Sequence, residues 1–227
     1  MNYIISSVKM MIDSKRIKVR ETFNPYLAPF RRLKLKTTQF TIISNNCWGG
    51  HVYRYFGIKY QSPTVGLYFF CDDYLKFINN LKYYINFELR FIKHEESKYY
   101  KILEERGGND AICPIGILDD VEIIFLHYGS EKEAFEKWTR RSKRIVWDNI
   151  VYKMSEQNKC TDKLLAEFDK LEEKRKFCFV TKDKGLKSQV LFKEYSDSDS
   201  VSNDTILFRK YIKLACFING EPFKKKQ

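Results

Sequence analysis

One short stretch, Phe40–Gly50, restricts the fold of this chain more than any other. A β-branched apolar run ends at Ser44, and two Asn, a Cys, a Trp and a Gly pair follow before a helical pattern begins. A strand, a tight turn and a helix in this order are typical of layered α/β proteins. In an open α/β sheet such a turn lies at the carboxyl end of a strand, where ligands bind. We therefore expect the functional site at this turn.

The rest of the chain alternates between short apolar runs and amphipathic stretches. Apolar runs predict strands near 39–44, 57–60, 113–118, 121–126, 176–181, 188–193 and 213–218. Helical spacing predicts helices at 47–56, from Asp72 onward, after Ser130 and at 161–170, with Ser130 and Thr161 as N-caps. This order predicts a single α/β domain with a layered parallel or mixed sheet and helices on both faces. The acidic, Ser-rich stretch 196–204 is expected to be a mobile loop.

Basic residues are concentrated at the two ends of the chain. The net charge is +12, and residues 1–36 hold nine Lys or Arg against only Asp13 and Glu21. We therefore divide the chain into a basic N-terminal extension (1–36), an α/β domain (37–220) and a basic tail (221–227). The extension includes an amphipathic helix that we expect to break at Pro25 and Pro29. The balanced charge of the domain disfavours nucleic acid as a partner, whereas basic ends favour contact with an anionic membrane surface.

Cysteine spacing and hydropathy indicate the cellular compartment of the protein. The six cysteines are irregularly spaced, and no pair has metal-ligand or redox spacing. No apolar run approaches the ~20 residues of a membrane-spanning helix, and no secretory signal is recognisable. We expect a cytoplasmic protein without a metal site. The basic ends also allow peripheral contact of this protein with the inner face of the membrane. The sequence leaves the oligomeric state open.

Cys47 and His127 are the candidate catalytic pair. A thiol in the first turn of a helix can be activated by the helix dipole, and a neighbouring His can act as its general base. His127 follows the predicted strand 121–126, so a parallel sheet would bring it to the same edge as Cys47. Asn45, Asn46 and Gly49 could supply oxyanion donors at the turn. The alternatives are a buried, inert Cys47 and a structural His127; other pocket candidates are Trp48, His51 (a competing base), Ser62 and Thr64.

A basic stripe follows His127. Lys137, Arg140, Arg141 and Arg144 recur at helical spacing. Guanidinium groups bind phosphates bidentately, so the stripe suits a phosphorylated donor such as an acyl-CoA or a nucleotide sugar. The alternative is an ordinary solvated helix face.

Several uncommon motifs resemble those of one bacterial domain family of unknown function. They are Ile42–Gly50, Tyr60–Leu67, Asp73–Phe77, Pro114–Gly116, His127–Tyr128 and Lys137–Arg144, and they occur in the family's order over about residues 35–220. Members of that family are labelled exopolysaccharide or capsular-polysaccharide biosynthesis proteins. The Asn-Cys turn is also similar to that of a capsule-locus acyltransferase group. The resemblance implies an α/β protein linked to surface-polysaccharide assembly and does not supply a reaction.

Three functions agree with these observations. The first is a transferase of surface-polysaccharide biosynthesis, in its sharper form an acyltransferase with Cys47 as nucleophile and His127 as base. The second is a glycosyl- or phosphosugar-transferase whose arginines bind a sugar nucleotide. The third is a non-catalytic accessory protein of a membrane-associated assembly. The first two require a phosphorylated donor and a saccharide acceptor.

Overall fold

A four-stranded parallel sheet forms the centre of the computed structural model, which describes residues 2–172 and 175–221, with only the backbone for 2–14 and 16. Its spatial order is β1 (Thr41–Ser44), β5 (Ile150–Ser155), β6 (Lys176–Val180) and β7 (Gln189–Leu191). In the register of the first pair, Ser44 lies opposite Lys153. The residues that follow β1 are therefore placed beside the last residues of β5.

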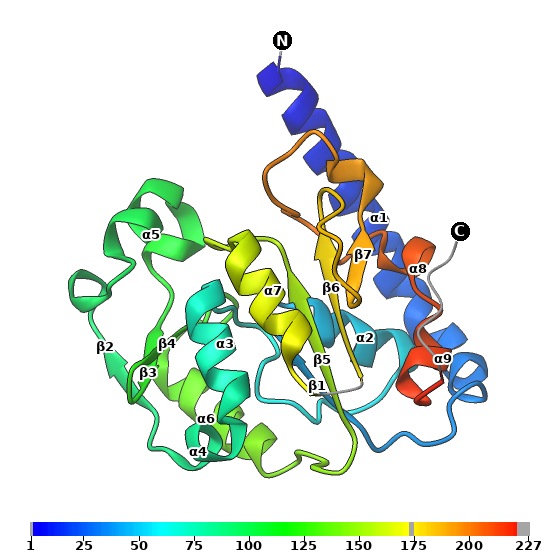
Figure 1. Cartoon of the computed structure of the whole chain (residues 1–227), viewed down its shortest axis with the longest axis horizontal. Helices are drawn as coiled ribbons and strands as arrows, with labels where there is room; N and C mark the ends of the chain where they lie inside the picture. The colour runs from blue at the N-terminus through cyan, green and yellow to red at the C-terminus, as the bar shows by residue number, and fades with distance from the viewer. Residues whose placement is uncertain (1, 173–174, 222–227) are drawn as a thin grey trace.

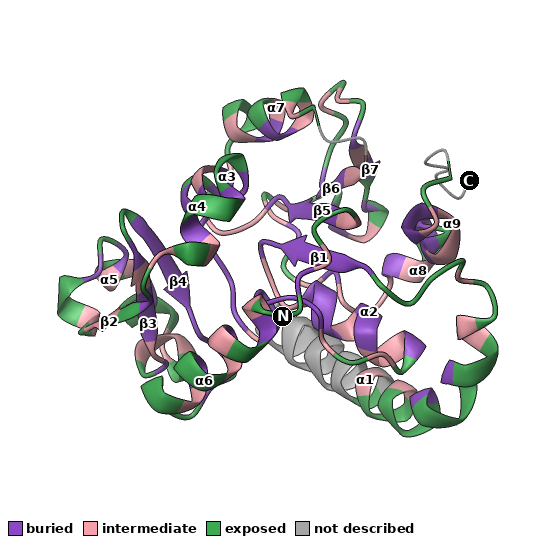
Figure 2. Ribbon diagram, turned by 90° about the horizontal axis from the view of Figure 1, so that it is seen from below, coloured by how far each residue is buried: buried purple, intermediate pink, exposed green. Residues whose placement is uncertain are grey.

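Helices cover both faces of this sheet (Figures 1 and 2). One face carries α3 (Cys71–Asn79) and α7 (Asp162–Lys170), and the other carries α2 (Trp48–Phe56), α8 (Phe208–Tyr211) and α9 (Leu214–Ile218). Successive strand residues point to opposite faces. Ile43 accordingly packs in the core beneath α3, whereas Ile42 packs in the core beneath α2. The predicted α/β layering is confirmed.

A second, antiparallel sheet lies beside the first. It consists of β2 (Arg90–Ile92), β3 (Ile115–Leu118) and β4 (Val121–Ile124), accompanied by α4 (Leu81–Asn86), α5 (Tyr100–Arg106) and α6 (Glu131–Ser142). Short 3₁₀ turns occur at His94–Glu96, Gly108–Ala111 and Lys193–Tyr195. The expectation that His127 follows a strand of the same sheet as β1 is wrong, because β3 and β4 pair as an antiparallel hairpin across the turn at Asp119.

The segment 65–69 connects the two sheets. Tyr68 exchanges two backbone hydrogen bonds with Ile124 of β4, both 2.9 Å long. The next residue, Phe69, donates to the Asn45 carbonyl at 3.0 Å. The turn after β1 and the end of β4 are therefore held close together by one extended segment.

The first helix, α1 (Asn2–Arg32), continues through Pro25 and Pro29. The predicted break is wrong, although each proline removes a helical N–H. Arg31 and Arg32 donate to the Tyr55 and Phe56 carbonyls at the end of α2, at 3.0 and 2.9 Å. Contacts with α2 thus offset the weakened ladder. None of the helices in the described part of the chain combines the length and apolar character needed to cross a bilayer.

The predicted helix caps are confirmed, whereas several predicted strands are wrong. Ser130 and Thr161 cap α6 and α7 as expected. Residues 58–60 form no strand, and 213–218 contain α9 instead of a strand, because a short apolar run does not distinguish the two states by periodicity. Strands β2 and β5 were not predicted.

The acidic stretch 196–204 packs against the sheet instead of forming a free loop. Val201 is fully buried, and its N–H donates to the Glu156 carbonyl at 2.7 Å. Asp204 is fully buried as well. Of the predicted basic tail, residues 222–227 lie outside the described part of the chain.

Candidate functional site

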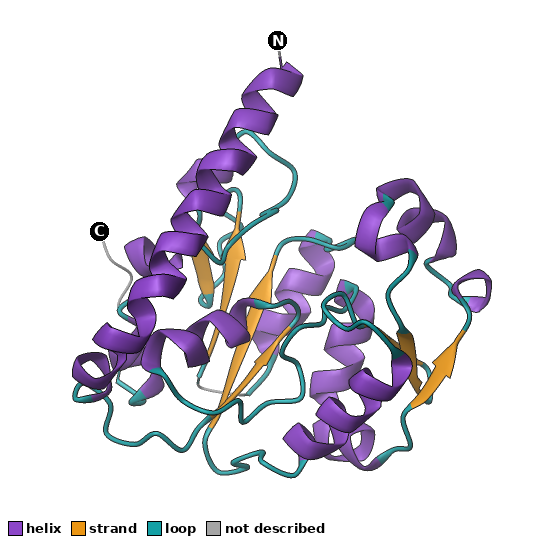
Figure 3. Ribbon diagram, turned by 180° about the vertical axis from the view of Figure 1, so that it is seen from behind, coloured by secondary structure: helices purple, strands orange, loops and turns teal. Residues whose placement is uncertain are grey.

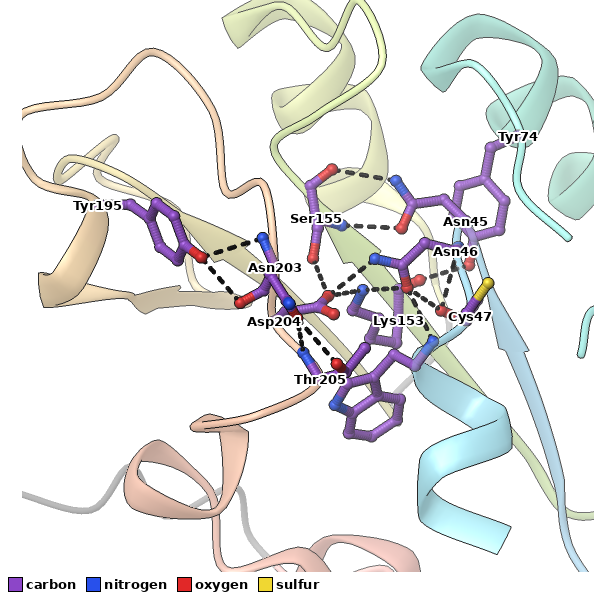
Figure 4. A network of polar contacts seen from close by, with 12 residues as sticks. Asn45, Asn46, Cys47, Tyr74, Lys153, Ser155, Tyr195, Asn203, Asp204 and Thr205 are labelled. Atoms are coloured by element: carbon purple, nitrogen blue, oxygen red, sulfur yellow. Dashed lines mark hydrogen bonds and ion pairs between the residues drawn. The ribbon is translucent and has the colours of Figure 1, made fainter. Parts of the chain in front are cut away.

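A buried polar network lies where β1 and β5 end (Figure 4). Lys153 of β5 forms an ion pair with Asp204, and neither side chain is exposed to solvent. Lys153 Nζ also donates to Asn46 Oδ1 at 2.8 Å, and Ser155 Oγ donates to Asp204 Oδ2 at 2.6 Å. The Asn46 amide donates to the same carboxylate oxygen at 3.0 Å. The network thus joins the turn after β1, the end of β5 and the segment before α8.

The charges of this network lie in an apolar setting. Lys153 Nζ lies 5.9 Å from the Trp48 ring centre and 5.8 Å from that of Phe179. Burial lowers the pKa of Lys153, and the Asp204 carboxylate partly opposes this shift. All the contacts of Asp204 described above use Oδ2. Its other oxygen, Oδ1, is buried and has no hydrogen-bond partner among the described residues.

A cavity of about 750 Å³, which we call the central cavity, opens next to the network. Asp204 and Asn46 line it together with residues that follow strands of both sheets, such as Cys47 after β1 and Leu126 after β4. Its charged lining residues are four basic and two acidic side chains: Arg54, Arg106, Lys137, Arg141, Asp110 and Asp204. Arg54 pairs with Glu21, Arg106 with Asp110 and Lys137 with Glu133. Arg141 forms no ion pair among the described residues, so it is the lining cation whose charge most favours an anionic ligand.

Cys47 and His127 both line the central cavity. The Cys47 thiol contacts the Leu67 carbonyl at 3.7 Å, and the His127 N–H donates to the Gly66 carbonyl at 3.0 Å. The connecting segment therefore brings them together, although they follow strands of different sheets. No hydrogen bond between their side chains is described. Burial raises the pKa of the Cys47 thiol to about 12 and lowers that of His127, so at neutral pH both groups are uncharged.

The amides of the turn are engaged in structural contacts. Asn45 Nδ2 donates to the Ser155 carbonyl, and Asn45 Oδ1 accepts from the Ser155 N–H, each at 3.0 Å. The Asn46 oxygen also accepts from the Trp48 N–H at 3.1 Å, which fixes the start of α2. At Gly49, an added Cβ would lie 3.2 Å from the Ile42 side chain, so this glycine allows α2 to approach β1.

The four basic residues predicted to form a stripe, three on α6 and Arg144 just after it, are divided between cavity, groove and solvent. Lys137 and Arg141 line the central cavity, Arg144 lines a neighbouring groove beneath α1, and Arg140 is exposed. Arg141 is almost fully buried and donates to the Val65 carbonyl at 2.8 Å and to the Tyr128 hydroxyl at 2.5 Å. Two of the four predicted phosphate-binding residues thus reach the cavity.

The remaining candidates have different surroundings. His51 lines the cavity, and its Nδ1 accepts from Arg20 at 2.8 Å and from Arg54 at 2.9 Å. Burial and these two guanidinium groups lower the pKa of His51 to about 3. The Trp48 side chain is fully buried in the core. Ser62 and Thr64 are buried and hydrogen-bonded to each other at 3.0 Å, and they are absent from the cavity lining.

Comparison with known proteins identifies the family. Residues 18–216 match the model of a domain of unknown function, DUF1919. An uncharacterized protein of Haemophilus influenzae is 32% identical over 171 residues, which cover 75% of this chain and 76% of that protein. The chain belongs to the DUF1919 family. The matched region includes the second half of α1.

Sequence reasoning missed the fully buried ion pair of this DUF1919 domain, Lys153 with Asp204. Lys153 interrupts the apolar run Ile150–Met154, and a Lys within a buried strand requires a buried acidic partner. That signal could have identified β5 and prompted the search for a partner. Nothing in the sequence singles out Asp204 from its acidic neighbours, and Arg54, Arg106 and Asp110 reach the cavity only through the tertiary fold.

Proposed function

We propose that this protein is a transferase of bacterial surface-polysaccharide biosynthesis that binds a phosphorylated donor in the central cavity. The observation that carries this proposal is the cation of Arg141, which lines the cavity and forms no ion pair among the described residues. Arginine and lysine bind phosphate oxygens through charge-assisted hydrogen bonds. The link to surface polysaccharides rests on the motif resemblance described above.

The cavity offers groups for both halves of a transfer reaction. Arg141 and Lys137 hold the donor's phosphates, while His127, uncharged at neutral pH, accepts the proton of an acceptor hydroxyl. The hydroxyl oxygen bonds to the sugar's anomeric carbon, the bond from that carbon to phosphate breaks, and the diphosphate leaves with the electron pair.

Acyl transfer through Cys47 is the second candidate, because Cys47 and His127 line the same cavity. The raised pKa of the thiol means that no thiolate is present at rest. His127 would therefore take the thiol proton as the sulfur attacks an acyl-CoA, and would return it to the departing CoA sulfur. The free energy needed to form the thiolate makes this route the less favoured of the two.

Ligand titration tests the donor. We expect the purified protein to bind UDP, used as the minimal nucleoside diphosphate, in a calorimetric titration. Lys137→Gln and Arg141→Gln should each weaken UDP binding by about tenfold or more, as expected for the loss of a charge-assisted hydrogen bond. Arg140→Gln is the matched control, since Arg140 adjoins Arg141 on the same helix but is exposed.

A second titration with coenzyme A separates the two candidates. Tight binding of coenzyme A, acetylation of Cys47 by acetyl-CoA, and loss of that label in His127→Asn would favour acyl transfer. If neither UDP nor coenzyme A binds, or if Lys137→Gln and Arg141→Gln both bind UDP as the natural chain does, the transferase proposal is wrong and the accessory-protein alternative gains support.

A further inference from the structure

The outward face of α1 carries a continuous row of exposed apolar side chains. Tyr26 is 74% exposed, Phe30 69% and Leu33, just after the helix, 83%. Together with Val19, Phe23 and Leu27, they recur at intervals of three and four residues, so they lie on one side of the helix. We call these six residues the outer stripe.

The opposite face of α1 is fixed to the body of the protein. Asn24 and Ala28 are buried, and Arg31 bonds to Asn24 at 2.7 Å as well as to the Tyr55 carbonyl. Figure 3 shows α1 running along the outside of the molecule and beyond the sheet. Because the inner face is occupied by contacts with α2, the outer stripe is held toward solvent.

The charges around the stripe have one sign. Lys15, Lys18 and Lys34 are exposed along the same helix and its end. Among the described side chains of α1, the sole acidic one is Glu21, which pairs with Arg54 at 3.2 Å on the inner side. An exposed aromatic and aliphatic face flanked by lysines is the pattern of a helix that lies in a membrane interface.

A groove of about 640 Å³ follows one side of the stripe. Four basic residues, Lys15, Arg20, Arg31 and Arg209, line it together with apolar side chains that include Val19 and Phe23. Burial, and after it the nearby Arg209, lower the pKa of Arg20 to about 10. Such clustered cations are stabilised by an anion, and the adjoining apolar wall suits the acyl part of a lipid.

We propose that the outer stripe docks onto an anionic membrane surface, with its apolar side chains in the headgroup–acyl boundary and the groove holding lipid phosphates. Charge complementarity favours this occupant over a second copy of the chain. Two stripes packed face to face would bring the lysines of both helices together, whereas acidic lipids neutralise them. The proposal does not depend on the transferase function.

Vesicle flotation with the full chain tests this docking. We expect binding to phosphatidylcholine vesicles that contain about 30% phosphatidylglycerol, and little binding to phosphatidylcholine alone. Phe23→Ser/Phe30→Ser should weaken the binding by at least about tenfold, because two aromatic rings that enter the headgroup–acyl boundary are lost. Phe135→Ser is the matched control, since Phe135 is an exposed aromatic residue, 46% accessible, on α6.

Lys15→Gln/Lys18→Gln/Lys34→Gln should reduce binding to the anionic vesicles and its dependence on salt. Far-ultraviolet circular dichroism checks that each variant is folded. Absence of vesicle binding by the natural chain, or equal binding by the Phe23/Phe30 variant, overturns the proposal. A dimer that this variant abolishes, without vesicle binding by the natural chain, would assign the stripe to a second copy instead.

Discussion

At the scale of single residues, the ion pair between Lys153 and Asp204 has the largest expected effect on the free energy of unfolding. Both side chains are fully buried, and the pair is surrounded by hydrogen bonds from Asn46 and Ser155. A buried pair of this kind adds little over an apolar replacement, but an unpaired buried charge is costly. Each of the two buried charges is therefore stable in the folded chain only because the other neutralises it.

Removing one partner should be strongly destabilising. We expect Lys153→Met to lower the free energy of unfolding by about 3–5 kcal/mol, because it leaves Asp204 buried without its cation. The double variant Lys153→Met/Asp204→Asn should cost less than the sum of the single changes. Urea denaturation measures each value. Lys163→Met, which removes the exposed ion pair with Glu167, is the control and should change stability by less than about 1 kcal/mol.

His51 should make the stability depend on pH. Its folded pKa, about 3, lies below the ordinary value of 6.5, so protonation favours the unfolded chain. The contribution of the neutral ring is complete above pH 6.5 and is lost as the pH falls toward 3. We expect a loss of about 1–2 kcal/mol between pH 7 and pH 5 from this group.

Denaturation at several pH values measures that loss. His51→Gln should have a shallower dependence, because Gln still accepts from Arg20 and Arg54 but does not titrate. His94→Gln is the control, since the described contact of the His94 ring is with the Cys113 carbonyl at 2.7 Å and not with arginines. Equal slopes for His51→Gln and the natural chain would contradict the assignment.

At the scale of elements, the connecting segment 65–69 decides the shape of the cavity. Gly66 has φ +84, and an added Cβ would lie 3.0 Å from the Tyr128 ring. The Gly66 carbonyl accepts a hydrogen bond from the His127 N–H. Gly66 therefore helps to position two residues of the cavity lining, His127 and Tyr128. Glycine is required here both for its backbone conformation and for the close approach.

Gly66→Ala should therefore both destabilise the fold and disturb the cavity. We expect a cost of about 1–3 kcal/mol in thermal or urea denaturation, together with weaker UDP binding. Gly185→Ala is the matched control: its φ of +68 imposes similar backbone strain, but its Cβ would meet nothing within 4 Å. Equal effects of the two changes would show that the contact with Tyr128 does not matter.

At the scale of the whole molecule, two sheets and an outer helix meet around one cavity. The turn after β1 supplies Cys47, the end of β4 leads to His127, and Ile17 of α1 also lines the cavity. Arg20 donates to the Thr205 carbonyl and to His51, which couples α1 to the cavity wall. If α1 docks on a membrane as proposed, the cavity lies close to that surface.

The sequence predicted those features that depend on local rules. The strand–turn–helix at Phe40–Gly50, the caps at Ser130 and Thr161, and the α/β layering all follow from periodicity and capping chemistry. A short run such as 213–218 satisfies the periodicity of strand and helix alike, and there the prediction was wrong. The predicted helix break at Pro25 and Pro29 was wrong for a different reason: contacts between α1 and α2 outweigh the tendency of proline to end a helix.

By itself, then, the sequence determined that the turn around Cys47 stands at the carboxyl end of a strand in an α/β protein. Only the tertiary structure decided which residues meet it there. Lys153 and Asp204, separated by 51 positions, form their ion pair because β5 adds beside β1 and the segment before α8 returns to that edge. Burial then decides the protonation of Cys47 and His51, since the free energy of a charge depends on its surroundings and not on its neighbours in sequence.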